Sequence, residues 1–285
     1  MDRRRLTVKK ATLEGIVREM GGFALAFSGG VDSSFLLAVA VSLPGVRVLA
    51  ATADSSTYPS CEKKTALAFA ASLGAEHRLF LSEELDIRGF AANPPGRCYH
   101  CKNELFGKLA AIAREARLPW VADGSNVDDL KDYRPGRAAR ERWGVRSPLE
   151  EAGLSKEEIR FLSREMGLPD WKRPAQACLA SRFPYGTEIT REKLKVVERA
   201  EEALRGLGIA QVRVRHHGDL ARVEIDRCNF GEAVLRHREE IVEIVKRSGF
   251  LYVALDLEGY RTGSMNEGLA AEDFSLPPSP LRCTR

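Results

Sequence analysis

The sequence predicts an α/β protein with a parallel sheet covered by helices on both faces, followed by a smaller C-terminal α/β domain. Three features predict this class. Short apolar segments alternate with helical ones as far as residue 124, a glycine-rich turn follows the first apolar segment, and alternation of period two appears beyond residue 210. The 285 residues are enough for one large domain and a smaller one.

The first domain is expected to span residues 1–170. Its segments in chain order are a helix at 4–20, a strand at 23–27 followed by a turn and a helix, a strand at 47–53, a helix at 60–73, a strand at 77–81, a helix at 103–116 and a strand at 120–124. Apolar strands that alternate with helices are typical of a parallel sheet buried on both faces.

The chain changes character after this alternation. Residues 126–153 are rich in Asp, Arg, Pro and Gly, so we expect a functional loop region there, before a helix at about 155–166. Residues 171–189 are expected to form a junction that also carries chemistry. The second domain, residues 190–285, is expected to contain a helix at 190–206, two strands within 212–225, a helix at 231–247 and a strand at 250–258.

Composition limits the possible partners. A net charge of +4 from 44 basic and 40 acidic residues allows at most a local positive patch, which suits a phosphorylated small molecule and does not argue for DNA binding. No apolar stretch of about 18 residues occurs, and the basic start carries no signal-peptide pattern, so we expect a cytoplasmic protein that does not bind membranes.

Ser28-Gly29-Gly30-Val31-Asp32-Ser33 follows the first strand and opens a helix. Two glycines and a helix N-terminus make a cradle for an anion, because backbone N–H groups can approach it closely. The hydroxyl groups of Ser28 and Ser33 can donate to the same anion, and Asp32 can cap the helix or hold Mg²⁺. The alternative is an ordinary strand-to-helix turn with an Asp cap. The chain lacks the Walker and dinucleotide-binding patterns.

Six cysteines occur in the chain, and in a reducing compartment those that cluster are candidates for metal binding or catalysis. Cys98 and Cys101 form a Cys-x-x-Cys pair. Locally, this pair could be a redox dithiol, half of a zinc site, part of an iron-sulfur site or two buried thiols. The isolated cysteines, which we expect to be structural or incidental, are Cys61, Cys228 and Cys283.

The hexapeptide SGGVDS resembles the pyrophosphate loop of the N-type ATP pyrophosphatase (PP-loop) superfamily, whose fold is like that of adenine nucleotide alpha hydrolases. Further segments resemble the LarE family, sulfur transferases that help to build the nickel-pincer nucleotide cofactor of lactate racemase. These segments are NPPGRCYHCK, DGSNVDD, DYRPG, VRSPL, ACLASRFPYG, VRVRHHGDLARVEI and YRTGSMN, and they extend to about residue 266.

The resemblance implies a reaction. ATP, with Mg²⁺, would adenylate a carboxylate of pyridinium-3,5-biscarboxylic acid mononucleotide, and a sulfur nucleophile would displace AMP to leave a thiocarboxylate. In sacrificial members of the family the sulfur comes from one cysteine, which becomes dehydroalanine; the matching residue here is Cys178. The family also implies a homo-oligomer, a hexamer built through the second domain.

The sacrificial members lack the cysteine pair, whereas LarE-like proteins with three cysteines are thought to use a 4Fe-4S cluster. The resemblance therefore implies that Cys98, Cys101 and Cys178 hold three irons of such a cluster, which relays sulfide from a donor that the sequence does not identify. Sacrificial donation from Cys178 is the main alternative. Zinc binding, a redox dithiol and a PP-loop enzyme that thiolates tRNA stay open beside it.

Residues beside the cysteines are further candidates. Lys102 could neutralise a phosphate or the charge that develops on the attacked carboxylate. Ser181 and Arg182 follow Cys178 closely, and a nearby cation would favour the reactive thiolate.

Other candidates would bind the nucleotide or the substrate. Gly124, Ser125, Asn126 and Asp128 end a predicted parallel strand, where ligands of open α/β sheets bind; Arg134 is a weaker candidate. Arg213 and Arg215 share one face of a strand, which suits a substrate phosphate, although an exposed, charged edge would look the same. Arg261 is a similar candidate. The adjacent His216 and His217 should point in opposite directions and so should not share a ligand.

Overall fold

We describe the protein from a computed structural model, for residues 2–87, 89–131, 136–169, 171–174, 177–261 and 263–267. The chain divides into two compact units. The first unit comprises Met1–Glu83 and Cys98–Gln176, and the second comprises Glu84–Arg97 and Ala177–Arg285. The segment before the cysteine pair therefore packs with the C-terminal part of the chain.

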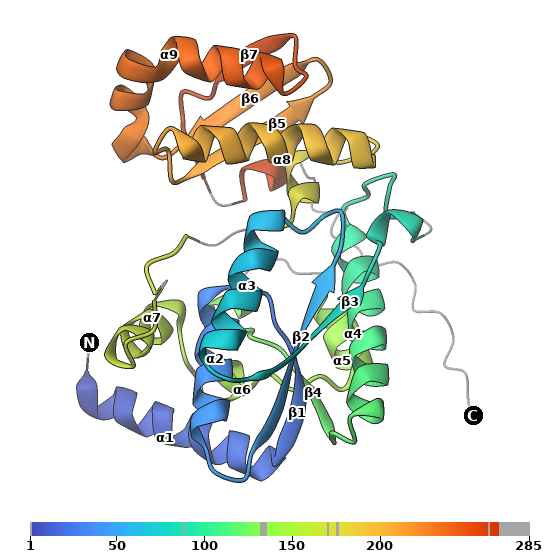
Figure 1. Cartoon of the computed structure of the whole chain (residues 1–285), viewed down its shortest axis with the longest axis vertical. Helices are drawn as coiled ribbons and strands as arrows, with labels where there is room; N and C mark the ends of the chain where they lie inside the picture. The colour runs from blue at the N-terminus through green and yellow to red at the C-terminus, as the bar shows by residue number, and fades with distance from the viewer. Residues whose placement is uncertain are drawn as a thin grey trace. The chain divides into compact units, whose positions relative to one another are not determined.

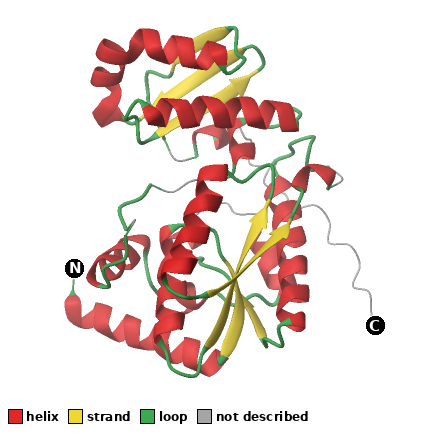
Figure 2. Ribbon diagram, in the orientation of Figure 1, coloured by secondary structure: helices red, strands yellow, loops and turns green. Residues whose placement is uncertain are grey.

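The described part of the first unit contains a parallel four-stranded sheet in the order β3-β2-β1-β4 (Figures 1 and 2). Its strands are β1 (Gly22–Ala26), β2 (Arg47–Asp54), β3 (Glu76–Leu81) and β4 (Trp120–Ala122). Its helices are α1 (Arg3–Met20), α2 (Val31–Ser42), α3 (Ser60–Ser72), α4 (Arg97–Glu115), α5 (Gly136–Trp143), α6 (Pro148–Glu151) and α7 (Lys156–Glu165). The predicted parallel sheet is confirmed.

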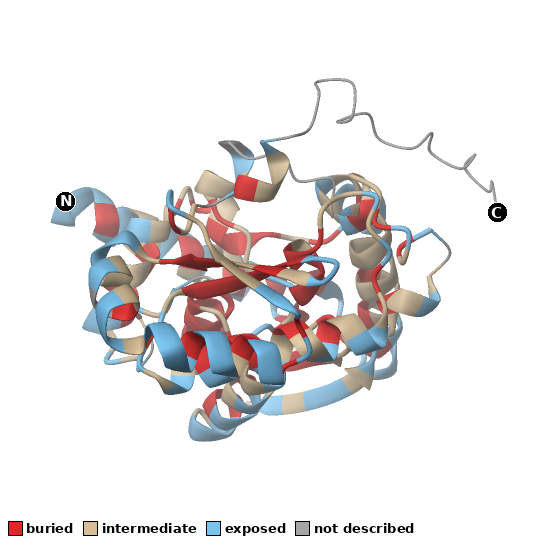
Figure 3. Ribbon diagram, turned by 90° about the horizontal axis from the view of Figure 1, so that it is seen from above, coloured by how far each residue is buried: buried red, intermediate tan, exposed pale blue. Residues whose placement is uncertain are grey.

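Helices cover both faces of this sheet, as predicted. Phe23 and Leu25 of β1 face one core, together with residues of α1, α2, α3, α6 and α7. Ala24, between them, faces a second core built with α4 and α5. Side chains that alternate along a strand thus meet two helical layers. Figure 3 colours the chain by burial, with buried residues in red and exposed residues in pale blue.

Two predicted boundaries in the first unit are wrong. The helix expected at 103–116 begins at Arg97, where the backbone N–H of Arg97 donates to the carbonyl of Pro94, so the cysteine pair lies in the first turns of α4. The loop region expected at 126–153 instead carries η2 (Val127–Lys131), α5 and α6.

The second unit has a three-stranded sheet in the order β5-β6-β7 within its described residues. β5 (Val212–His217) and β6 (Leu220–Ile225) are antiparallel, whereas β7 (Tyr252–Leu255) runs parallel to β6. The helices of this unit are η1 (Glu84–Asp86), η3 (Leu179–Arg182), α8 (Arg191–Gly206), η4 (Arg227–Asn229), α9 (Phe230–Arg247) and η5 (Ser264–Asn266). The expected smaller α/β layer is therefore present.

Among the described residues, no helix has the length and apolar character needed to cross a membrane.

Candidate functional site

The turn between β1 and α2 brings the residues of SGGVDS together. Gly29 has a φ of 62°, and a Cβ there would lie 2.9 Å from Cα of Ala66 on α3. The Ser28 and Ser33 hydroxyl groups lie 3.2 Å apart. Gly30 is the N-cap of α2 and provides no capping side chain, so the first N–H groups of this helix are available to an anion.

The end of β4 meets the same turn. β1 and β4 are parallel neighbours, so their carboxyl ends lie at one edge of the sheet. A Cβ on Gly124 would lie 2.9 Å from the backbone N of Ser33, so a residue larger than glycine would crowd the first turn of α2. The predicted nucleotide-binding residues after β4 therefore lie beside the SGGVDS turn.

Asp32 is the charged centre of this region. Its Oδ2 accepts hydrogen bonds from Lys156 Nζ at 2.6 Å and from Asn126 Nδ2 at 3.4 Å, whereas its Oδ1 is buried and has no hydrogen-bond donor among the described residues. Burial raises the pKa of Asp32, and the charge of Lys156 opposes that rise. Asp128 Oδ2 accepts from the backbone N–H of Lys156 at 2.9 Å, which ties the β4 loop to the start of α7.

Tyr58 supports the turn from the loop after β2. Its hydroxyl group donates to the carbonyl of Ser28 at 2.6 Å, and burial, together with the charge of Glu62, raises its pKa. It therefore acts as a neutral hydrogen-bond donor that holds the Ser28 backbone.

The cysteine pair lies at the start of α4. Cys98 is exposed and Cys101 is half-buried, and residues three apart on a helix share a face. Lys102 lies on the same helix, with its ammonium group 5.4 Å from the centre of the Phe106 ring. Its catalytic role stays a prediction.

Cys178 lies in the second unit, where it is exposed and is the N-cap of η3. Arg182 fixes the backbone around it: Nη1 donates to the carbonyls of Ala177 at 2.9 Å and Cys178 at 3.2 Å and to Ser181 Oγ at 2.9 Å. Arg182 itself is fully buried. Arg182 thus contacts the loop around Cys178 through two backbone carbonyls and the Ser181 hydroxyl group.

Glu201 on α8 anchors that arginine. Its oxygens accept from Arg182 Nε at 2.7 Å and Arg182 Nη2 at 2.8 Å, and also from Arg205 and from the backbone N–H of Val214. Burial works to raise the pKa of Glu201, but the charge and hydrogen bonds of Arg182 outweigh burial and lower it. The carboxylate is therefore ionised and joins η3, α8 and β5.

Arg213 and Arg215 share a face of β5, but that face is buried, so the exposed, charged edge weighed as an alternative is wrong. The guanidinium group of Arg213 lies 5.1 Å from the centre of the Tyr260 ring. Arg215 donates to Glu224 at 2.6 Å, to Ser264 at 3.0 Å and to the carbonyl of Ser181 at 2.9 Å. Binding of a substrate phosphate by these arginines stays a prediction.

The remaining predicted residues are Arg261, the two histidines of β5, Arg134 and Cys283. Arg261 forms ion pairs with Glu258 at 2.9 Å and Glu267 at 3.1 Å. His216 is buried and stacks on Phe183, whereas His217 is exposed, as expected for neighbours on a strand. Arg134 and Cys283 lie outside the described residues.

Asn93, which precedes the Cys98–Cys101 pair, is hydrogen-bonded to the segment that follows Cys178. It is fully buried, has a φ of 56°, and donates through Nδ2 to the carbonyl of Pro184 at 2.7 Å; its own carbonyl accepts from Gly186 at 2.9 Å. Four residues later, the guanidinium group of Arg97 lies 4.6 Å from the centre of the Tyr185 ring. The segment that ends directly before Cys98 is therefore fixed to the segment that follows Cys178.

Within the described residues, no group of three or more His, Cys, Asp or Glu side chains is arranged to hold a metal ion. Cys178 belongs to a different unit from Cys98 and Cys101, so their joint use stays a prediction.

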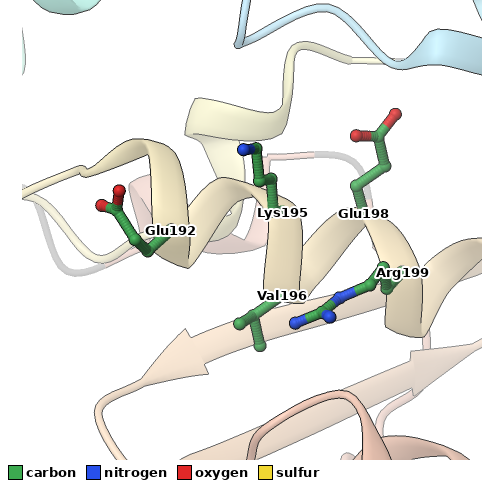
Figure 4. A pocket seen from close by; sticks show the side chains of 5 residues that line it. All are labelled: Glu192, Lys195, Val196, Glu198 and Arg199. Atoms are coloured by element: carbon green, nitrogen blue, oxygen red, sulfur yellow. The ribbon is translucent and has the colours of Figure 1, made fainter.

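The pocket shown in Figure 4 lies along α8 and is lined by Glu192, Lys195, Val196, Glu198 and Arg199. All five come from one helix, and none is a cysteine or a residue of the SGGVDS turn. We therefore do not assign the function to this pocket.

Comparison with known proteins gives close relatives. No model of a known protein family matches the chain. A Synechocystis sp. protein of uncharacterised function is 45% identical over 266 residues, covering 93% of this chain and 99% of the relative. The pyridinium-3,5-bisthiocarboxylic acid mononucleotide synthase of Lactiplantibacillus plantarum is 37% identical over 265 residues, covering 93% of this chain and 96% of the synthase.

The chain belongs to the LarE family of sulfur-transferring enzymes. A Methanocaldococcus jannaschii protein of uncharacterised function is also similar, at 31% identity over 84% of this chain and 90% of its own length. LarE membership was expected from the sequence motifs and is confirmed. The use of a cluster bound by three cysteines stays a prediction.

Three residues important to this LarE site were not predicted. Glu201 occupies a position in the apolar stripe of α8 between Val197 and Leu204, and a carboxylate in such a stripe indicates a buried partner. Lys156 is the first residue of a helix, where the helix dipole disfavours a cation, so an acidic neighbour could have been inferred. No sequence pattern distinguishes Asn93.

Replacing Gly124 with alanine is expected to lower the free energy of unfolding by about 1–3 kcal/mol, because the new Cβ would lie 2.9 Å from the backbone N of Ser33. Urea denaturation measures the change. Gly15→Ala in α1 is the control: its Cβ meets nothing within 4 Å, so stability should rise by up to about 1 kcal/mol. Equal stability of Gly124→Ala and the wild type would contradict the close approach.

Replacing Glu201 with alanine should destabilise the protein by about 3 kcal/mol or more, because the buried Arg182 would lose its carboxylate partner. The free energy of unfolding in urea is the measurement. Glu243→Ala is the control, since it removes an exposed pair with Arg247 and should change stability by less than about 0.5 kcal/mol. Similar losses in the two variants would show that Glu201 is not an anchor.

Proposed function

We propose that this chain is an ATP-dependent sulfur transferase that converts pyridinium-3,5-biscarboxylic acid mononucleotide into its thiocarboxylic forms through an acyl-adenylate. The observation that carries the proposal is the similarity to the L. plantarum synthase along nearly the whole chain. The SGGVDS turn supports it, because an uncapped helix N-terminus flanked by close glycines suits a pyrophosphate group. A cytoplasmic location and a hexameric assembly are predictions that accompany it.

In the adenylation step, a substrate carboxylate oxygen attacks the α-phosphorus of ATP and pyrophosphate leaves. The backbone N–H groups of the SGGVDS turn, with Ser28 and Ser33, would bind the leaving pyrophosphate. The buried Oδ1 of Asp32 accepts no hydrogen bond from the described part of the chain, and a carboxylate oxygen of this kind is a suitable ligand for Mg²⁺. This fit supports ATP with Mg²⁺ as the cosubstrate.

In the transfer step, sulfur attacks the acyl carbon and AMP leaves. Cys178 is exposed, and a hydrogen bond from Arg182 holds its backbone carbonyl. The charge of Arg182 also acts on Cys178, and a nearby cation of this kind would favour the reactive thiolate. These features suit either a sulfur donor or a cluster ligand.

We favour a 4Fe-4S cluster held by Cys98, Cys101 and Cys178 as the source of sulfur. Cys98 and Cys178 are exposed, and Cys101 lies on the same helix face as Cys98. Within the second unit, Asn93 and Arg97 also bind the chain before Cys98 to the segment after Cys178. When bound, such a cluster supplies a replaceable sulfide. The alternative is donation of the Cys178 sulfur itself.

The proposal is tested with protein isolated without oxygen, given substrate, ATP and Mg²⁺. We expect AMP, pyrophosphate and thiocarboxylate to form and the protein to contain iron and sulfide. Cys178→Ala should still release pyrophosphate but form no thiocarboxylate, because adenylation does not need the thiol. Cys228→Ala, an exposed cysteine outside the site, is the control and should behave as the wild type.

Different results would exclude different parts of the proposal. Absence of pyrophosphate release from the wild type would refute the sulfur-transferase activity. Iron-free protein that converts Cys178 to dehydroalanine would refute the cluster and establish sacrificial donation. A loss of thiolated nucleosides in cells that lack the protein would favour tRNA as the substrate.

A further inference from the structure

Lys156 and Asp32 form a short ion pair beside the SGGVDS turn, although they are distant in sequence. Lys156 Nζ lies 2.6 Å from Asp32 Oδ2, and the side chains retain 30% and 21% of their exposure. The pair joins the first turn of α7 to the first turn of α2, and these two helices pack against each other. Lys156 is thus a cation held at the edge of the predicted pyrophosphate cradle.

The ion pair engages only one oxygen of Asp32 and only part of the hydrogen-bonding capacity of Lys156. Asp32 Oδ1 is buried and receives no hydrogen bond from any residue that the structure describes, which costs free energy unless another group binds there. The Lys156 ammonium has three N–H donors, and its side-chain contacts among the described residues use one of them, toward Asp32. Asp32 Oδ1 and the other N–H groups of Lys156 can therefore bind a polar, charged ligand.

A second cation lies one turn farther along α7. Arg160 follows Lys156 by four residues, so both occupy one face of the helix, and the charge of Arg160 also acts on Asp32. Arg160 donates to the carbonyl of Arg173 at 3.1 Å, which directs it away from a simple ion pair with Asp32. This face of α7 thus adds positive charge to the N-terminal end of α2, where the helix dipole is also positive.

We propose that Lys156 is a catalytic residue that binds the pyrophosphate of ATP and stabilises it as it leaves. The inference rests on the proposed function and adds a residue to its first step. Lys156 keeps one hydrogen bond to Asp32 Oδ2 and directs its other N–H groups to the phosphate oxygens. Asp32 Oδ1 then remains for Mg²⁺, so the two cations do not compete for one oxygen.

The step balances without any further reactant. A bond forms between the substrate carboxylate oxygen and the α-phosphorus, and the bond from the α-phosphorus to the bridging oxygen breaks. The electron pair of the broken bond goes to pyrophosphate, whose added negative charge is met by Lys156; Mg²⁺ held by Asp32 would add positive charge there. Lys156 keeps its proton throughout.

The test compares Lys156→Met with Lys9→Met. Lys9 forms an ion pair of similar length, 2.7 Å, with Glu158 in the first turn of the same helix, but no residue of the SGGVDS turn takes part. We expect Lys156→Met to lower kcat for pyrophosphate release by about 100-fold, the effect typical of removing one donor to transition-state charge. Lys9→Met should keep the wild-type kcat, and Lys156→Arg should retain more activity than Lys156→Met.

Binding of inorganic pyrophosphate with Mg²⁺, measured by calorimetry, provides a readout that does not require turnover. Lys156→Met should bind pyrophosphate at least about 10-fold more weakly, as expected for a lost charged contact, while AMP binding is unchanged. A thermal melt of each variant checks folding. If Lys156→Met does not fold, Lys156→Gln, which keeps a polar donor at this position, is measured in its place.

The outcomes separate this inference from the proposed function. If the wild type releases pyrophosphate and a folded Lys156→Met variant keeps its kcat and its pyrophosphate affinity, the role of Lys156 is refuted and the proposed function stands. If the wild type releases no pyrophosphate, the proposed function fails, and the calorimetric comparison still decides whether Lys156 binds the anion. Equal losses in Lys9→Met and Lys156→Met would also overturn the inference.

Discussion

The close approach of backbone segments around the first turn of α2 is the constraint on which the first unit depends. β1 and β4 are neighbours, so the turns that follow them meet at one edge of the sheet. Gly29 and Gly124 lie where a Cβ would collide with Ala66 and Ser33. Their small size lets three parts of the chain converge on one helix N-terminus, and the same convergence places Asn126 next to Asp32.

The second unit holds its cysteine loop by a different means, with buried charge. Two carboxylates, Glu201 and Glu224, bind arginines that in turn donate to carbonyls of the loop. Buried ion pairs contribute little net stability compared with apolar packing, but they fix the positions of the groups that they join. The backbone of the loop is therefore held firmly while the Cys178 side chain faces outward.

The sequence predicts those parts of the fold that rest on long, regular patterns. The parallel sheet and its two helical layers follow from alternating apolar segments, and the hairpin of β5 and β6 follows from its period of two. The start of α4 was not predicted, because RCYHCK has no apolar stripe and follows two prolines. α5 was missed for a similar reason, since Ala139 is its one buried residue in the described part of the chain.

The sequence likewise predicts part of the candidate site and misses the rest. The SGGVDS residues and those after β4 come together because topology places the ends of neighbouring strands at one edge. The partners of charged residues depend on tertiary contacts, so the sequence does not reveal that Lys156 meets Asp32 or that Glu201 holds Arg182. The arginines of β5 were assigned to one face correctly, but pairing with a buried carboxylate is not visible in the period-two pattern.

The placement of Glu84–Arg97 in the second unit gives the chain an unusual path. It passes from the first unit to the second after Glu83, returns after Arg97 and leaves again after Gln176. Neither unit can therefore be excised by a single cut, because the chain crosses between the units three times. Cys98 and Cys178 lie within two residues of two of these crossings, so two of the three cysteines predicted to act together sit where the chain passes from one unit to the other.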